Sequence, residues 1–83
     1  MNTTTTETLE TQLWVLMSEK LGLEQEQIKM TDSFADDLGV DSLDLFALLT
    51  DVEKEFSIKI PDEEAEKLTT VKALVNYLHA HLS

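Results

Sequence analysis

The most distinctive candidate for chemistry is a serine at the start of a predicted helix, within the run Asp-Asp-Leu-Gly-Val-Asp-Ser-Leu-Asp at residues 36–44. If Asp41 caps that helix, its carboxylate accepts a hydrogen bond from a first-turn N–H, and Ser42 becomes the first helical residue. The Ser42 hydroxyl then projects from the positive end of the helix dipole, where unpaired backbone N–H groups would stabilise an attached phosphate. The alternative is that Ser42 is itself the cap and carries nothing.

Metal and nucleophile chemistry have little support in the sequence. The chain has no cysteine, which excludes a thiolate metal site and a cysteine nucleophile. His79 and His81 lie on different faces of a predicted helix without a partner at zinc-site spacing, and a favourable interaction with the helix C-terminus explains them. Leu38 and Val40 stand where a calcium-binding loop needs oxygen ligands. We therefore expect no specific metal site and no catalysis by this chain alone.

The chain is strongly acidic, with 17 Asp and Glu against 6 Lys and no Arg, which gives a net charge of −11. Residues 31–66 hold 12 of the acids and only 2 of the lysines. Such charge repels nucleic acids and anionic membranes, and it predicts partners with basic patches. No apolar run is longer than that of residues 45–49, which is too short to span a bilayer, and the first residues lack a secretory signal pattern. We expect a cytoplasmic protein.

Three stripes of apolar residues at helical spacing predict three main helices. A chain of 83 residues has room for one core, so the stripes must face one another in a single domain over residues 1–83, expected to be monomeric. Residues 1–6 are polar and are expected to fray. The sequence thus predicts an all-α fold, a small helical bundle. The predicted helices span about residues 7–21, about residues 41–56, and a last segment capped by Thr69 or Thr70. In the same order, their apolar stripes are Leu9, Leu13, Leu16 and Met17; then Leu45, Leu48, Leu49, Val52 and Phe56; and last Val71, Leu74, Val75, Leu78 and Leu82.

The connections between these helices also carry information. Gly22 suits the left-handed position just past a helix end. The stretch at residues 24–40 is aperiodic, and its length predicts a packed or functional loop. Residues 57–60 are expected to run extended into Pro61, after which Asp62 caps a short additional helix. The expected apolar anchors of the long loop are Ile28, Met30, Phe34 and Leu38.

Three segments resemble bacterial acyl carrier proteins, namely residues 34–44, residues 53–64 and residues 69–78. Together they cover most of residues 28–78, and an Asp-Ser-Leu in register with its flanking segments is the specific part of the resemblance. The resemblance implies a four-helix bundle in which a phosphopantetheinyl transferase attaches 4′-phosphopantetheine from coenzyme A to Ser42. The thiol of that group would hold acyl intermediates as thioesters and carry them between synthase enzymes of fatty acid synthesis. Because this thiol would come with the attached group, the resemblance also accounts for the absence of cysteine from the chain.

The resemblance implies two further sets of residues near Ser42. Apolar residues of the inward stripes would form both the core and a pocket for the acyl chain. Acidic and exposed apolar residues on or beside the second helix would dock the basic patches of partner enzymes. The implied pocket residues are Leu45, Leu49, Val52 and Leu74. The implied docking residues are Asp37, Asp41, Leu43, Asp44, Phe46, Asp51, Glu53 and Glu55.

Two residues depart from the usual pattern of that family. Ala47 stands where an acidic residue is usual, and Phe46 stands where a smaller aliphatic residue is usual. Docking can therefore differ from that of the housekeeping fatty-acid carrier, so a carrier for a polyketide or another dedicated lipid pathway stays open. Two interpretations from other classes stay open as well, an unmodified acidic interaction module and an ion-binding protein.

Overall fold

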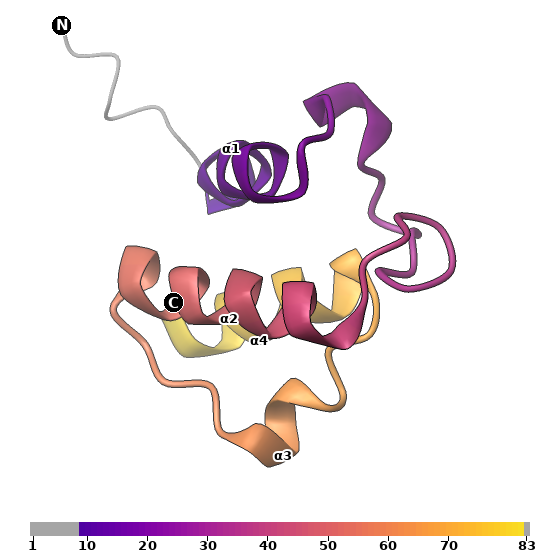
Figure 1. Cartoon of the computed structure of the whole chain (residues 1–83). Helices are drawn as coiled ribbons and strands as arrows, with labels where there is room; N and C mark the ends of the chain where they lie inside the picture. The colour runs from indigo at the N-terminus through magenta and orange to yellow at the C-terminus, as the bar shows by residue number, and fades with distance from the viewer. Residues whose placement is uncertain (1–8, 83) are drawn as a thin grey trace, which may run out of the picture.

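The computed structural model describes residues 9–82, which fold into four α-helices and one turn of 3₁₀ helix (Figure 1). Within these residues the only strand-like pairing is an isolated bridge between Ser33 and Thr70, so the predicted all-α fold is confirmed. The expected fraying of residues 1–6 and the start of the predicted first helix lie outside the described residues. The elements are α1 (Leu9–Leu21), the 3₁₀ turn η2 (Gln25–Gln27), α2 (Ser42–Phe56), α3 (Asp62–Ala65) and α4 (Val71–Leu82).

α2 and α4 lie in the middle of the molecule, with α1 on one side of them and the short α3 on the other (Figure 1). The three long helices turn their apolar stripes inward, and no polar side chain is buried within residues 9–82. Apolar burial therefore drives the packing of this core. Leu82 is an exception to the predicted stripe, because it is 39% exposed at the end of α4. The fully buried side chains are Leu13, Met17, Phe34, Leu48, Val52, Val71, Leu74, Val75 and Leu78.

Left-handed residues end the first two long helices. Gly22 has φ +68° and donates its N–H to the carbonyl of Ser18 at 3.0 Å, as predicted for the end of α1. Ser57 adopts φ +57° after α2 and donates its N–H to the carbonyl of Glu53. The expectation that residues 57–60 are extended is therefore wrong at Ser57, and the chain runs without regular structure from Ile58 to the start of α3.

The caps of the last two helices agree only in part with the sequence-based expectation. Oγ1 of Thr70 accepts a hydrogen bond from the N–H of Ala73 at 3.1 Å, so Thr70 is the cap of α4. The prediction that Asp62 caps α3 is wrong, because Pro61 holds the cap position and Asp62 is already the first helical residue. Proline fits there because its extended backbone leads into the helix without needing an N–H of its own.

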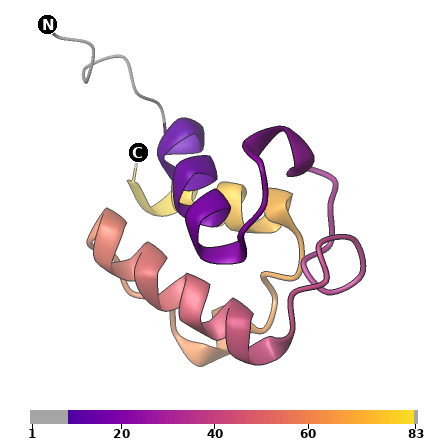
Figure 2. The same ribbon diagram turned by 45° about the horizontal axis from the view of Figure 1, so that its top comes forward.

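The long loop between α1 and α2 projects to one side of the bundle (Figure 2) and is packed rather than free. The indole N–H of Trp14 donates to the carbonyl of Ile28 at 2.8 Å. Phe34 is 1% exposed, and its N–H donates to the carbonyl of Thr69 at 3.0 Å, which ties the loop to the start of α4. The prediction that Met30 anchors the loop is wrong, since Met30 is 37% exposed beside an open hollow next to Trp14.

Polar contacts connect α1 with both of the other long helices. Nζ of Lys20 lies 2.8 Å from a carboxylate oxygen of Asp51 on α2, and this hydrogen bond raises the pKa of Lys20. Nε2 of His79 on α4 lies 2.9 Å from Oε2 of Glu10, and that hydrogen bond lowers the pKa of Glu10. Because all four side chains are partly exposed, these pairs add little to stability beside the core.

The packing of α1 gives a first prediction. Met17→Ala should lower the free energy of unfolding by about 2–5 kcal/mol, because it leaves a cavity where a fully buried side chain was. Urea unfolding followed by circular dichroism measures the change. Val15→Ala is the control on the same helix, since Val15 is 37% exposed and should cost less than about 1 kcal/mol. Equal losses for the two variants would contradict the orientation of α1.

Candidate functional site

The N-terminus of α2 makes Ser42 its first helical residue. Asp41 is the cap, since its Oδ1 accepts the N–H of Asp44 at 2.8 Å and its carbonyl accepts the N–H of Leu45 at 2.9 Å. Ser42 is exposed, and its hydroxyl makes no hydrogen bond to any residue between 9 and 82. The alternative in which Ser42 is the cap is therefore excluded, and its hydroxyl is accessible to another molecule.

Backbone N–H groups at the same helix end are also open. An α-helix leaves its first N–H groups without a carbonyl acceptor. At α2 the carboxylate of Asp41 satisfies the N–H of Asp44, while those of Ser42 and Leu43 have no acceptor in the described part of the chain. These N–H groups lie at the positive end of the helix dipole, beside the Ser42 hydroxyl, and can bind the oxygens of a phosphate group.

The loop before α2 has a defined conformation that sets where the helix begins. Gly39 adopts φ +68°, which a residue with a side chain rarely does. The next residue, Val40, is 6% exposed and donates its N–H to the carbonyl of Phe34 at 2.7 Å. Oδ2 of Asp37 accepts the N–H of Ser33 at 2.7 Å, which closes the preceding turn. The chain therefore enters α2 from a turn anchored in the core.

Two small hollows flank Ser42. One, of about 180 Å³, lies between α2 and α3, and the other, of about 160 Å³, lies between α2 and the loop before it. Ser42 and Leu45 line both, so a flexible arm attached to Ser42 can reach either hollow. Their other walls are mainly apolar, with Leu49 and Ala65 in the first and Phe34 and Val40 in the second.

The structure divides the four residues of the implied acyl pocket. Leu45 lines both hollows, and Leu49 lines the hollow against α3. Val52 and Leu74 are fully buried in the core and line neither hollow. The pocket function of all four stays a prediction, and only the first two lie where an arm from the start of α2 can touch them.

Three of the residues that line the hollow between α2 and α3 were not predicted from the sequence to be pocket residues. Ala65 and Glu66 form its α3 side, and Phe46, which the sequence assigns to docking, forms part of its α2 side. A helix of four residues has no readable apolar period, so nothing in the sequence indicates which of its residues faces α2. For Phe46 the available signal was its departure from the family pattern.

Four of the implied docking residues are exposed on α2. Leu43 is 79% exposed and Phe46 is 56% exposed. Asp44 and Glu55 are exposed too, and no ion pair engages either carboxylate within residues 9–82. These four side chains are accessible to a partner.

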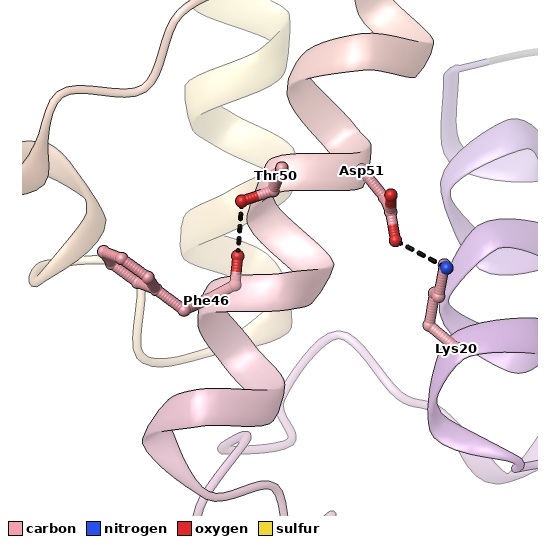
Figure 3. Close-up of polar contacts among 4 residues, drawn as sticks. All are labelled: Lys20, Phe46, Thr50 and Asp51. Atoms are coloured by element: carbon pink, nitrogen blue, oxygen red, sulfur yellow. Dashed lines mark hydrogen bonds and ion pairs between the residues drawn. The ribbon is translucent and has the colours of Figure 1, made fainter.

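The other four docking residues are already engaged within the chain. Asp37 and Asp41 accept hydrogen bonds from the backbone of their own turns. Oε2 of Glu53 accepts a backbone N–H from the segment after α2 at 2.6 Å. Asp51 faces α1 and pairs with Lys20, on the side of α2 away from Phe46 (Figure 3). Their negative charge still contributes to the field around α2, but one carboxylate oxygen of each is already bonded within the chain.

The described residues offer little support for metal binding or for membrane insertion. No three His, Asp or Glu side chains between residues 9 and 82 come close enough to hold a metal ion. His81 instead lies 2.9 Å from the carbonyl of Tyr77 and stacks on its ring at 4.0 Å. Burial raises the pKa of the Tyr77 hydroxyl, which donates to the carbonyl of Lys59. Across the same residues, no helix is both long enough and apolar enough to cross a bilayer.

The sequence is similar to known proteins along most of its length. Residues 12–78 match the family described as "Phosphopantetheine attachment site", a span that includes Ser42. An acyl carrier protein from Clostridium acetobutylicum is 50% identical over 66 residues, which cover 80% of this chain and 86% of that protein.

The cap of α2 can be tested separately from any attached group. Asp41→Ala should lower the free energy of unfolding by about 1 kcal/mol, because the N–H of Asp44 loses its acceptor. Asp41→Asn should keep most of that stability, since an asparagine oxygen caps as well and only the charge is removed. Urea midpoints of the two variants and the parent protein measure the difference. Equal losses in both variants would show that the charge, not the cap bond, matters at this position.

Proposed function

The chain belongs to the acyl carrier protein family, and on that premise we propose that Ser42 carries its 4′-phosphopantetheine group. The main support is that the Ser42 hydroxyl is exposed and unbonded at the start of α2, while Asp41 caps the helix. The other described serines suit the role less well. Ser18 donates its hydroxyl to a backbone carbonyl, Ser33 lies in the turn before α2, and Ser57 lies at the negative end of the same helix.

The surroundings of Ser42 fit this prosthetic group. The open N–H groups of Ser42 and Leu43 suit a phosphodiester, and the hollows lined by Leu45 suit the less polar parts of an arm and its cargo. When bound, the group supplies a thiol that holds acyl chains as thioesters, a function that the chain cannot supply because it has no cysteine. The chain itself holds the attachment oxygen at a defined helix end and provides apolar shelter next to it.

The protein is a carrier of acyl groups rather than a catalyst, in keeping with its family. We infer that it is a substrate of a phosphopantetheinyl transferase and that it then shuttles acyl intermediates between enzymes of fatty acid synthesis. We expect it to act as a cytoplasmic monomer. Its own structural contribution is an exposed attachment point on a small helical domain.

We infer that basic patches on these enzymes dock against α2. The net charge of −11 attracts such patches over distances comparable with the Debye length. At contact, Asp44 and Glu55 offer carboxylates that no internal ion pair engages, and Leu43 and Phe46 offer exposed apolar surface. Association would therefore be fast and sensitive to salt.

The exposed face of α2 also supports a second candidate function, a carrier dedicated to a specialised lipid or polyketide pathway. Ala47 is exposed and Thr50 directs its hydroxyl to the carbonyl of Phe46 at 2.9 Å (Figure 3), so neither supplies a negative charge. Lys54, one turn further along, is basic and exposed. A partner that requires a continuous row of acids on this helix would bind poorly, whereas a partner with an apolar centre and basic flanks would fit.

Intact-mass measurement tests the attachment site. Incubation with coenzyme A and a broad-specificity phosphopantetheinyl transferase should add the mass of one phosphopantetheine group to the protein and none to Ser42→Ala. Ser57→Gly is the control, because it removes an exposed serine at the other end of α2 at a backbone angle that glycine accepts, and it should be modified normally. A mass gain in Ser42→Ala, or none in the parent protein, would reject the proposal.

The docking acids can be compared by removing one charge at a time. Asp44→Asn should slow modification by the transferase roughly two- to fivefold at low ionic strength, and added salt should reduce the difference. Asp51→Asn removes the same charge from a carboxylate that is paired with Lys20, and its effect should be smaller. Initial rates at two ionic strengths measure both variants. If Asp51→Asn were the slower variant, direct contact at Asp44 would be excluded as the basis of docking.

A further inference from the structure

The groove between α2 and α3 contains two neighbouring hollows. The near hollow, of about 180 Å³, begins at Ser42, and the far hollow, of about 130 Å³, lies further along α2. Three residues line both: Phe46 and Leu49 from α2, and Ala65 from α3. The boundary between the two hollows therefore lies at these three side chains.

The two hollows differ in chemistry. The near hollow is lined by Leu45 and Leu49, with Glu66 contributing one charged group. The far hollow has one further apolar lining residue, Ile60, but it is also lined by the hydroxyl-bearing Thr50 and the carboxylate-bearing Glu53 and Asp62. An apolar chain gains free energy when it enters the near hollow, but in the far hollow it would displace water from charged groups.

Phe46 is the exposed part of this boundary. Leu49 and Ala65 are only 4% and 9% exposed, so they form the floor of the groove. Phe46 is 56% exposed, so its ring rises from that floor. Figure 3 shows the ring leaving α2 on the side opposite to Asp51 and Lys20. The backbone of Phe46 is held in the helix, and its carbonyl accepts the hydroxyl of Thr50, so the ring projects from a fixed point.

We propose that the ring of Phe46 closes the far end of the near hollow and so limits the length of acyl chain that the protein can shelter. This inference rests on the proposed function, because it requires the acyl group to be tethered at Ser42. An apolar cavity of about 150 Å³ accepts benzene, so the near hollow has room for roughly six to eight carbon atoms. The cargo class that fits the shelter is therefore a short to medium acyl chain.

The ring of Phe46 acts in this proposal as a wall at the far end of the near hollow. The stabilisation of the protein by acylation should therefore increase with chain length only up to that wall. Each methylene group that enters the near hollow leaves water and adds to the stability of the folded state. Carbons beyond the wall stay in water or face the carboxylates of the far hollow, so they add nothing. The rise in melting temperature on acylation should grow with chain length and then level off.

A series of acylated proteins tests this. The protein is loaded from butanoyl-, hexanoyl-, octanoyl-, dodecanoyl- and hexadecanoyl-coenzyme A by a broad-specificity transferase, and loading is verified by intact mass. For each variant, the melting temperature of the acylated form is compared with that of the form carrying an unacylated arm. In the parent protein the rise should level off near octanoyl. In Phe46→Val, which adds the volume of the removed ring to the near hollow, it should level off at a longer chain than in the parent protein, and in Phe46→Trp it should level off at a shorter chain.

Ala47→Leu is the matched control, since it changes the apolar surface of α2 at an exposed position that lines neither hollow. Its plateau should stay at the same chain length as in the parent protein. Because each comparison is made within one variant, a change in basal stability cancels. If Phe46→Val does not fold, Phe46→Leu and Phe46→Trp still test the wall, one by removing the ring and the other by enlarging it.

The outcomes separate this inference from the function on which it rests. A plateau at the same chain length in the parent protein, Phe46→Val and Phe46→Trp would overturn the role of Phe46 and leave the carrier function intact. A plateau that moves equally in Ala47→Leu would also overturn it, because the effect would then not depend on the hollow. Failure of the parent protein to gain any acyl-phosphopantetheine mass would reject the proposed function, and this inference with it.

Discussion

The hydrogen bond from the N–H of Asp44 to the carboxylate of Asp41 is the contact on which the candidate site depends. A serine at the cap position would direct its oxygen to its own backbone, and its hydroxyl would then not be free. Because Asp41 takes that position, Ser42 falls one residue later and keeps its hydroxyl exposed. The position of the helix start is in turn set by Val40, which is buried and bonded to the loop. The packing of Val40 in the core thus fixes the position of Ser42, two residues later.

The acidic residues near α2 have two different physical roles. Some hold the structure together locally: Asp41 caps the helix, Glu53 binds the backbone of the following segment, and Asp51 ties α2 to Lys20 of α1. Asp44 and Glu55 make no such ion pair in the described residues and keep their carboxylates exposed. All of them add to the negative field around α2, but only in the second group is neither carboxylate oxygen engaged in an ion pair within the described residues.

A domain of this size has little stability to spare, and the arrangement of its apolar residues reflects that. Val52 and Leu74 are fully buried and belong to the core alone. Leu45 and Leu49 lie at the edge of the core and also line the hollow beside α3. Under the proposed function, a hollow at the edge would let an apolar chain enter next to Ser42 without opening the centre of the bundle, where an empty cavity would be costly.

The sequence alone determined the three long helices, their inward faces and the left-handed end at Gly22, because each depends on residues within one or two turns of each other. It left open whether Asp41 or Ser42 caps α2, which the structure decides in favour of Asp41. It did not determine that Asp51 pairs with Lys20, that Met30 is exposed, or that Phe46 lines a hollow beside α3. Those properties depend on which distant segment packs opposite each side chain. Helical periodicity identifies the buried face of a helix, but only the tertiary structure decides what lies across from its edges.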